Sequence, residues 1–261
     1  MVIIGAGGIG SWLAPAVARL LEYREQGSAL FIVDGDSFEP KNKERQNFSR
    51  LGNKAQVLAY ELQPQFDHTV IIPMPNWIVD QLPKDEGDGE DDAAEDEDEV
   101  TPGRPLAIRS LLQEDDVVFA VVDNFSARKV IFDAAKDYKN IDVLTGGNDD
   151  QLFGSTYHYQ RRDGRDVTDH PAEYHEELLN PPDRNPGELS CQERAELEGG
   201  TQLLATNMAV AAWLLARVHH VIFEDNEPAP QAEIMFDLGE GRAAAHDRAA
   251  EAVPVATVKG G

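Results

Sequence analysis

A glycine-rich turn between an apolar run and a helical segment constrains the fold of this chain more than any other feature. Residues 2–4 are apolar and lead into residues 5–10, whose letters GAGGIG fit the pattern G-x-G-x-x-G. Residues 9–23 follow with helical spacing of their apolar side chains. Such glycines allow a tight turn and let the backbone approach a phosphate at the positive end of the helix. The start of the chain therefore predicts a strand–turn–helix unit that binds a nucleotide.

Short apolar runs alternate with helical patterns along most of the remaining chain. This alternation predicts an α/β, Rossmann-like fold with a mainly parallel sheet, helices on both faces and an antiparallel C-terminal portion. We also expect a turn at Gly146 and Gly147. The predicted strands are residues 2–4, 29–33, 68–74, 117–122, 142–144, 153–159 and 233–238, and the predicted helices are residues 9–23, 54–62, 105–112, 127–135 and 202–218.

The sequence predicts a single domain over residues 1–241 that contains two irregular segments. Residues 85–104 are largely acidic, and because their charges repel one another we expect a disordered surface insertion. Residues 161–198 are polar and rich in proline, and we expect a long crossover loop of the kind that is usually functional or mobile. Residues 242–261 are predicted to form a flexible tail.

The net charge of the chain limits the kinds of partner that it can bind. Asp and Glu number 48 against 23 Lys and Arg, a formal net charge of −25. A field of this sign repels nucleic acid and anionic membranes, so we expect neither as a partner. The longest apolar stretch, residues 205–218, contains Asn207 and Arg217, so it predicts a buried helix rather than a membrane span. No signal peptide is recognised at the start, and we expect a cytoplasmic protein.

Taken alone, the glycine turn favours a nicotinamide-dependent dehydrogenase, in which Asp34 would bind ribose hydroxyls. The residues that follow change this interpretation. They are Asp34-Gly-Asp36, then Asn42, the pair Arg45-Gln46, Gly52-Asn-Lys54-Ala, and later Asp123-Asn124 followed by Arg128. In this order they resemble the ThiF/MoeB family and the related ubiquitin-activating enzymes over most of residues 1–150.

The resemblance implies an enzyme that uses ATP and Mg²⁺ to adenylate the C-terminal glycine carboxylate of a ubiquitin-like or sulfur-carrier protein. Attack of a carboxylate on the α-phosphate builds negative charge, so catalysis depends on positioning and charge stabilisation. Arg45 and Lys54 would face the phosphates, and Asp123 would hold Mg²⁺, which favours one or two carboxylates plus phosphate oxygens. Asp36 would support them. The predicted ATP-binding residues are Gly5, Gly7, Gly8, Gly10, Asp34, Asn42, Arg45, Lys54 and Asp123.

Cys191 is the single cysteine, which excludes an internal disulfide and a four-cysteine zinc site, and we expect no structural zinc. The resemblance implies one role, in which its thiolate attacks the acyl adenylate, since thiols are strong nucleophiles. Its acidic neighbours Glu188, Glu193 and Glu196 would raise its pKa and oppose that role. The other interpretation is an incidental thiol in an enzyme that stops at the adenylate.

Two departures from the family pattern and three alternatives accompany this interpretation. Family members often begin with a helix whose Arg reaches a partner subunit, and here the chain starts at the first strand. The spacing from Gly52 to Lys54 is one residue shorter than the common form. The alternatives are an NAD-dependent dehydrogenase, a non-catalytic scaffold subunit, and adenylation of a small molecule or RNA base. The resemblance also implies a homodimer, to which the apolar residues 202–218 would contribute.

Overall fold

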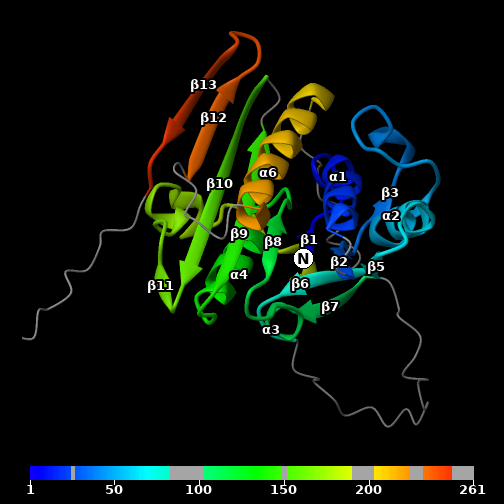
Figure 1. The fold of residues 1–261 in the computed structure, drawn as a ribbon, viewed down its shortest axis with the longest axis horizontal. Coiled ribbons are helices and arrows are strands. Elements are labelled where there is room, and N and C mark those ends of the chain that lie inside the picture. Colours follow the sequence, from blue (N-terminus) through cyan, green and yellow to red (C-terminus); the bar gives the residue numbers. More distant parts are fainter. Residues whose placement is uncertain (25–26, 83–102, 149–151, 190–202, 224–231, 249–261) are drawn as a thin grey trace, which may run out of the picture.

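A nine-stranded mixed sheet forms the centre of the computed structural model, which describes residues 1–24, 27–82, 103–148, 152–189, 203–223 and 232–248. The strand order is β13-β12-β10-β9-β8-β1-β2-β5, with β11 paired to β10 (Figure 1). The strands are β1 (Val2–Ile4), β2 (Ser28–Val33), β5 (Thr69–Met74), β8 (Val117–Ala120), β9 (Ile141–Asn148), β10 (Phe153–Arg162), β11 (Arg165–Asp166), β12 (Glu233–Asp237) and β13 (Arg242–His246).

Helices and two small sheets complete the described chain. The helices are α1 (Gly10–Tyr23), α2 (Lys54–Leu62), α3 (Ile108–Leu111), α4 (Phe125–Ala135) and α6 (Leu204–Phe223). Short 3-10 turns are η1 (Pro40–Asn42), η2 (Gln63–Gln65), η3 (Pro171–Glu173), η4 (Glu176–Leu178) and η5 (Pro186–Glu188). The small sheets pair β3 (Ser37–Phe38) with β4 (Gly52–Asn53), and β6 (Asn76–Val79) with β7 (Arg104–Ala107).

The sheet is parallel from β9 through β8, β1 and β2 to β5, and antiparallel from β9 through β10 and β12 to β13. The prediction of a mainly parallel Rossmann-like sheet with an antiparallel C-terminal portion is therefore confirmed. Strands of the parallel part are short apolar runs because helices cover both of their faces. In β1, for example, all three residues are buried.

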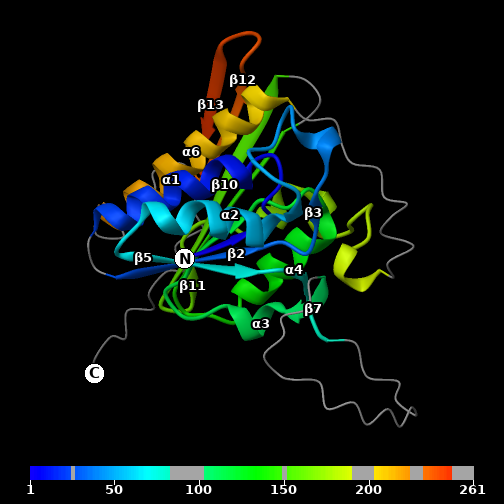
Figure 2. The same ribbon diagram turned by 90° about the vertical axis from the view of Figure 1, so that its right-hand side faces the viewer.

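Two hydrophobic cores lie on opposite faces of the sheet. Side chains alternate along a strand, so Ile3 faces one core while Val2 and Ile4 face the other. Figure 2 shows α1, α2 and α6 together on one side of the sheet, with α3 and α4 on the other. This arrangement leaves the carboxyl ends of the parallel strands at one edge. Among the described helices, none is long and apolar enough to cross a membrane.

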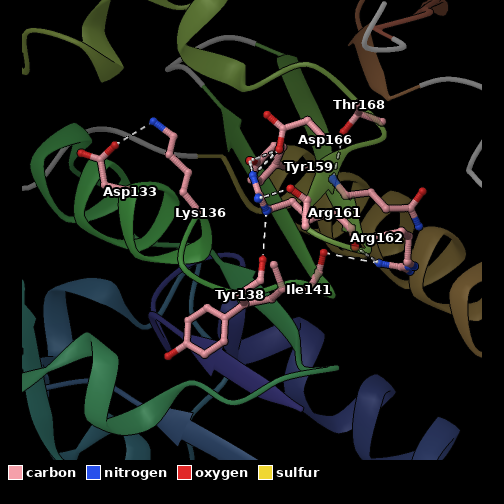
Figure 3. Close-up of polar contacts among 11 residues, drawn as sticks. Asp133, Lys136, Tyr138, Ile141, Tyr159, Arg161, Arg162, Asp166 and Thr168 are labelled. Atoms are coloured by element: carbon pink, nitrogen blue, oxygen red, sulfur yellow. Dashed lines mark hydrogen bonds and ion pairs between the residues drawn. The ribbon is translucent and has the colours of Figure 1, made fainter. Parts of the chain in front are cut away.

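The structure corrects the predicted ends of the irregular segments. A crossover loop is predicted from residue 161, but β10 continues through Arg162, because Arg161 pairs with Ile141 of β9 and Arg162 pairs with Arg165 of β11. Figure 3 shows the Arg161 guanidinium at the Tyr138 carbonyl and the Arg162 guanidinium at the Ile141 carbonyl. The tail was expected from residue 242, but Arg242–His246 forms β13, which pairs with β12 through the backbone. Residues 249–261 of the tail lie outside the described residues.

Two local predictions also differ from the structure. The helix expected over 105–112 is a helix only over Ile108–Leu111, because Arg104–Ala107 pairs in parallel with β6. Arg104 thus belongs to a strand rather than to the predicted acidic insertion, of which residues 85–102 lie outside the described residues. Gly146 and Gly147 lie within β9 and form no turn. A Cβ on Gly146 would stand 2.4 Å from Val210 Cγ1, so its glycine allows close packing of α6.

Candidate nucleotide-binding site

The carboxyl ends of β8, β1 and β2 are neighbours in the sheet, and three predicted site segments follow them directly. Asp123 follows β8, the glycine turn follows β1, and Asp34 follows β2. Ligands of open α/β sheets bind outside this edge. The backbone ties the segments together, since the Gly5 N–H donates to the Val33 carbonyl at 2.9 Å and the Val121 N–H to the Ile4 carbonyl at 2.9 Å.

The glycines of the turn have different roles in the packing. Gly5 has a φ of +98°, and a Cβ there would stand 2.7 Å from the Val121 carbonyl oxygen. A Cβ on Gly10 would stand 1.9 Å from the Gly5 carbonyl oxygen. Both glycines are therefore required by the fold itself. Gly7 is different, because the nearest atom to its missing Cβ is Gln46 Nε2 at 3.9 Å, and Gly8 lies next to it in the same turn. The fold does not require a glycine at Gly7.

Helix α1 presents its N-terminus to this edge without a side-chain cap. Within the described chain it has neither a capping hydrogen bond nor an acidic residue in its first turn. The other helices of this edge are capped, α2 by Asn53, which accepts the Gln56 N–H at 3.1 Å, and α4 by Asn124, which accepts the Ala127 N–H at 2.7 Å. Free N–H groups and the helix dipole attract an anion. Helix α1 is thus the helix of this edge whose N-terminus can receive a phosphate.

Asp34, Asp36 and Lys54 form a charged group at the end of β2. The Asp34 carboxylate accepts the Ala6 N–H at 2.6 Å and the Asp36 N–H at 2.8 Å, and Lys54 Nζ lies 2.5 Å from Asp36 Oδ2. Burial raises the pKa of the Asp34 carboxyl, against the opposing charge of Lys54. Burial alone would lower the pKa of Lys54, but the charges of Asp34 and Asp36 raise it, so the ammonium stays charged. The short spacing from Gly52 therefore does not keep Lys54 from this edge.

The segment after β3 carries Asn42 and Arg45 and is attached to the first turns of α1. Trp12 Nε1 donates to the Arg45 carbonyl at 3.1 Å, and the Asn47 N–H donates to Ser11 Oγ at 3.1 Å. Asn42 is buried, and its Oδ1 accepts a hydrogen bond from the Arg45 guanidinium at 2.8 Å. Both predicted ATP ligands are thus held against the helix that begins at the glycine turn.

Asp123 is exposed in the loop between β8 and α4. Its negative charge favours the charged forms of both Lys54 and Arg128. Arg128 donates to the Val122 carbonyl at 2.8 Å and the Gly146 carbonyl at 2.9 Å, so it joins the ends of β8 and β9 beside Asp123. Burial nevertheless lowers the pKa of Arg128 overall. The loop that carries the predicted metal ligand is therefore fixed in place.

A comparison with protein families identifies the family of this chain. The ThiF family matches residues 1–230. The chain belongs to the ThiF family. Membership indicates an enzyme of the adenylyltransferase type, which agrees with the motifs at Asp34, Arg45, Lys54 and Asp123. No curated protein sequence matches the chain.

Solved structures of other proteins have the same fold. The microcin C7 biosynthetic enzyme MccB, in complex with N-formylated MccA, has a TM-score of 0.63 and 16% identity, covering 99% of this chain and 67% of that chain. Escherichia coli MccB with ATP has a TM-score of 0.59 and 17% identity, covering 99% and 65%. PaaA has a TM-score of 0.57 and 17% identity, covering 95% and 64%. The ThiF-family chain thus spans about two thirds of the length of these proteins.

Three residues of this ThiF-family site received no role in the sequence analysis. Gln46 is buried beside Gly7, and its Oε1 has no hydrogen-bond partner in the described part of the chain. Asn53 donates to the carbonyls of Asp34 and Asp36 at 2.8 and 3.0 Å, so it shapes the loop between them. An Asn directly before a helical pattern is a capping signal that could have indicated it.

Asp183 is the third residue, and it comes from the crossover segment. Its carboxylate accepts the Phe125 N–H at 2.7 Å and the Ser126 N–H at 2.8 Å, which completes the cap of α4. No local pattern could have indicated a cap that lies 57–58 residues away in the chain. Cys191, eight positions further on, lies outside the described residues, so its predicted role stays a prediction.

Proposed function

We propose that this chain is an ATP- and Mg²⁺-dependent adenylyltransferase that activates the C-terminal carboxylate of a peptide or protein partner. One observation carries the proposal. The uncapped N-terminus of α1, at the glycine turn, lies at the same sheet edge as the charged Lys54 and the exposed carboxylate of Asp123. Family membership and the neighbouring structure of MccB with ATP support the choice of nucleotide.

The residues present fit a nucleoside triphosphate. The N–H groups of the glycine turn and the charges of Lys54 and Arg45 offset phosphate charge in a protein whose net charge is −25. Asp34 would accept the ribose hydroxyls. Among the described residues the Oε1 of buried Gln46, beside Gly7, has no partner, and a ligand hydroxyl or a metal-bound water would satisfy this acceptor.

The proposed reaction forms one bond and breaks one. An oxygen of the partner's carboxylate attacks the α-phosphorus of ATP, the bond from that phosphorus to the bridging oxygen breaks, and pyrophosphate leaves with the electron pair. The product is an acyl adenylate. Lys54, Arg45 and the α1 amides would stabilise the charge that develops on the phosphates. Mg²⁺, held by Asp123 and phosphate oxygens, would supply further charge stabilisation. Among the described residues no group of three or more His, Cys, Asp and Glu side chains could hold a metal, so this assignment depends on one carboxylate.

More specifically, we propose that the partner is a ubiquitin-like or sulfur-carrier protein that ends in glycine. A narrow, extended tail without side chains suits an edge where the backbone of the turn must approach the reacting phosphate closely. The structure of MccB in complex with N-formylated MccA supports a partner bound by a related fold. Acyl transfer to Cys191 is a second step that we propose only for the case in which a thiol-sensitive adduct is found.

We also propose that the chain forms a homodimer through α6. This helix has 20 residues, of which Arg217 alone belongs to the Asp, Glu, Lys and Arg set, in a chain where these residues make up 27%. Its outer side chains remain partly exposed, with Leu204 at 39%, Met208 at 47%, Trp213 at 37% and Phe223 at 39%. An apolar face of this kind on a strongly acidic protein favours association with a second apolar face.

ATP–pyrophosphate exchange with small Gly-ending carrier proteins tests the proposal. Wild type should catalyse exchange, Asp123→Ala should abolish it, and Cys191→Ala should leave it intact. Asp67→Ala is the matched control, because Asp67 is exposed in the loop before β5, at the opposite end of the strands. ATP–pyrophosphate exchange that persists in Asp123→Ala would refute the assignment of Asp123 as the Mg²⁺ ligand. An enzyme that binds ATP but catalyses exchange with no carboxylate partner would refute the proposed adenylation.

A further inference from the structure

A pocket of about 570 Å³ lies between helix α4 and the part of the crossover segment that contains η3 and η4. We call it the α4 pocket. The side chains that α4 contributes lie at positions i, i+3, i+4 and i+7, on one face of the helix, and they are Lys129, Phe132, Asp133 and Lys136. The other wall consists of side chains from residues 170–179. Small-molecule pockets in proteins have volumes of about 300–1,000 Å³, so the α4 pocket is large enough for a ligand.

The α4 pocket is separate from the proposed nucleotide site. Asn124 caps the end of α4 that faces the carboxyl ends of the strands, whereas the pocket residues of this helix begin at Lys129 and end at Lys136. An α-helix rises about 1.5 Å per residue, so these residues lie about 8 to 18 Å along the helix from its capped end. The described residues that line the pocket include none of the predicted ATP-binding residues.

The inner part of the pocket is apolar. Phe132 and Leu178 are buried, and the His170 ring packs edge-on against Phe132, with the ring centroids 5.7 Å apart. Burial and the charge of Lys136 hold the pKa of His170 at about 4, so this ring is uncharged at pH 7. Leu179 also lines the pocket and is exposed to 56%. Apolar side chains of this kind can cover the apolar part of a ligand, since removing apolar area from water is favourable.

Charged side chains line the outer part of the pocket, and the two walls differ in sign. On α4, Lys129 Nζ donates to one oxygen of the Asp133 carboxylate at 2.5 Å, and Lys136 Nζ donates to the other at 3.1 Å. Figure 3 shows the pair of Lys136 and Asp133. One carboxylate cannot neutralise two ammonium groups, so a positive charge remains on this wall of a protein whose net charge is −25. Glu173, in η3, is exposed and gives the other wall a negative charge.

An apolar surface beside two ammonium groups matches a ligand that is apolar over most of its length and anionic at one end. We propose that the α4 pocket binds a small molecule with an apolar ring system and a single carboxylate. The carboxylate would accept hydrogen bonds from Lys129 and Lys136, and hydrogen bonds between charged groups are stronger than neutral ones. The ring system would lie against Leu178 and Leu179. This ligand would bind whether or not the sheet edge holds a nucleotide.

Equilibrium dialysis with 2-naphthoate and its uncharged analogue 2-naphthamide tests the proposed site. The ligand efficiency of small molecules implies that 2-naphthoate binds the wild type with a Kd of about 1 mM. The double variant Lys129→Gln and Lys136→Gln should weaken 2-naphthoate binding about 2- to 30-fold and leave 2-naphthamide binding unchanged, because both ammonium groups are partly exposed. Lys41→Gln is the matched control, since Lys41 is also paired with a carboxylate, Glu39 at 2.7 Å, but lies in η1.

Two further variants test the other wall. Glu173→Gln removes the negative charge that repels a carboxylate, so it should strengthen 2-naphthoate binding up to about 5-fold and leave 2-naphthamide binding unchanged. Leu179→Gln removes an exposed apolar contact and should weaken the binding of both probes by the same factor. Opposite effects of the lysine and glutamate substitutions on one probe would show that its carboxylate lies between the two walls.

Three results would overturn the proposed site. They are a wild type without saturable binding of 2-naphthoate at millimolar concentrations, a double lysine variant that binds 2-naphthoate as tightly as wild type does, and a double lysine variant that loses affinity equally for both probes. The last result would show loss of the pocket rather than loss of a charge. Urea unfolding of each variant identifies any that is not folded. ATP–pyrophosphate exchange is a separate measurement, so failure of the proposed function would leave this test unaffected.

Discussion

Gly7→Ala is the substitution that most sharply separates a requirement of the ligand from a requirement of the fold. The backbone at Gly7 is not among the positive-φ positions, and the nearest atom to an added Cβ is Gln46 Nε2 at 3.9 Å. Alanine therefore fits the protein without strain. Because alanine reduces the entropy of the unfolded chain, we expect the free energy of unfolding to stay the same or rise by up to about 1 kcal/mol.

The effect on ATP binding should be large by comparison. The proposed phosphate approaches the backbone of the turn, so the added methyl group would occupy part of its space. Overpacking of this kind costs about 1–3 kcal/mol, which corresponds to about 5- to 150-fold weaker binding. Isothermal titration with Mg-ATP measures the affinity, and urea unfolding measures the stability. A folded Gly7→Ala protein that binds Mg-ATP as tightly as wild type would refute the phosphate assignment.

Gly10→Ala is the matched control for this experiment. Its added Cβ would stand 1.9 Å from the Gly5 carbonyl oxygen, a contact that the backbone cannot accept without moving. We therefore expect Gly10→Ala to lose stability in urea as well as ATP affinity. The contrast between two alanines in one turn distinguishes loss of the site from loss of the fold.

Three further predictions test other parts of the account. Asp183→Ala leaves two N–H groups of α4 without their acceptor and should lower the free energy of unfolding by about 1–2 kcal/mol in urea. The hydrogen bond from His175, with help from Arg248, holds the pKa of Glu233 at about 2, below its ordinary 4.5. The stability that Glu233 contributes should therefore be complete above pH 4.5 and be lost as the pH falls towards 2, and this acid-dependent loss should be smaller in Glu233→Gln when urea unfolding is compared at pH 7 and pH 3. If the proposed homodimer forms through α6, Met208→Glu on its exposed face should give a monomer in sedimentation experiments, whereas Val70→Glu on β5, exposed to 56%, should sediment as wild type does.

The parts of the fold that depend on neighbouring residues were predictable from the sequence. The strand–turn–helix unit at the start was found because its apolar run, glycines and helical spacing lie within 23 residues. Helix α2 was predicted with its observed bounds, Lys54–Leu62. Its cap, Asn53, stands directly before it, and capping residues mark helix starts.

Elements that depend on distant partners were not predictable in the same way. Strand β13 consists of Arg242–His246, whose three alanines show no apolar alternation, and it forms because β12 offers an edge for backbone pairing. The sequence predicts a helix where β7 forms, because the strand depends on pairing with β6, which ends 25 residues earlier in the chain. Asp183 reaches the site edge only through the tertiary fold, so it has no signature in its own segment.

Direct titration of the wild-type protein with Mg-ATP and with NAD tests the central claim, that the glycine turn, Lys54 and Asp123 surround one nucleoside triphosphate. The account predicts saturable binding of Mg-ATP that weakens when Mg²⁺ is removed, and no binding of NAD at the same concentrations. Saturable binding of NAD together with no binding of Mg-ATP would contradict it.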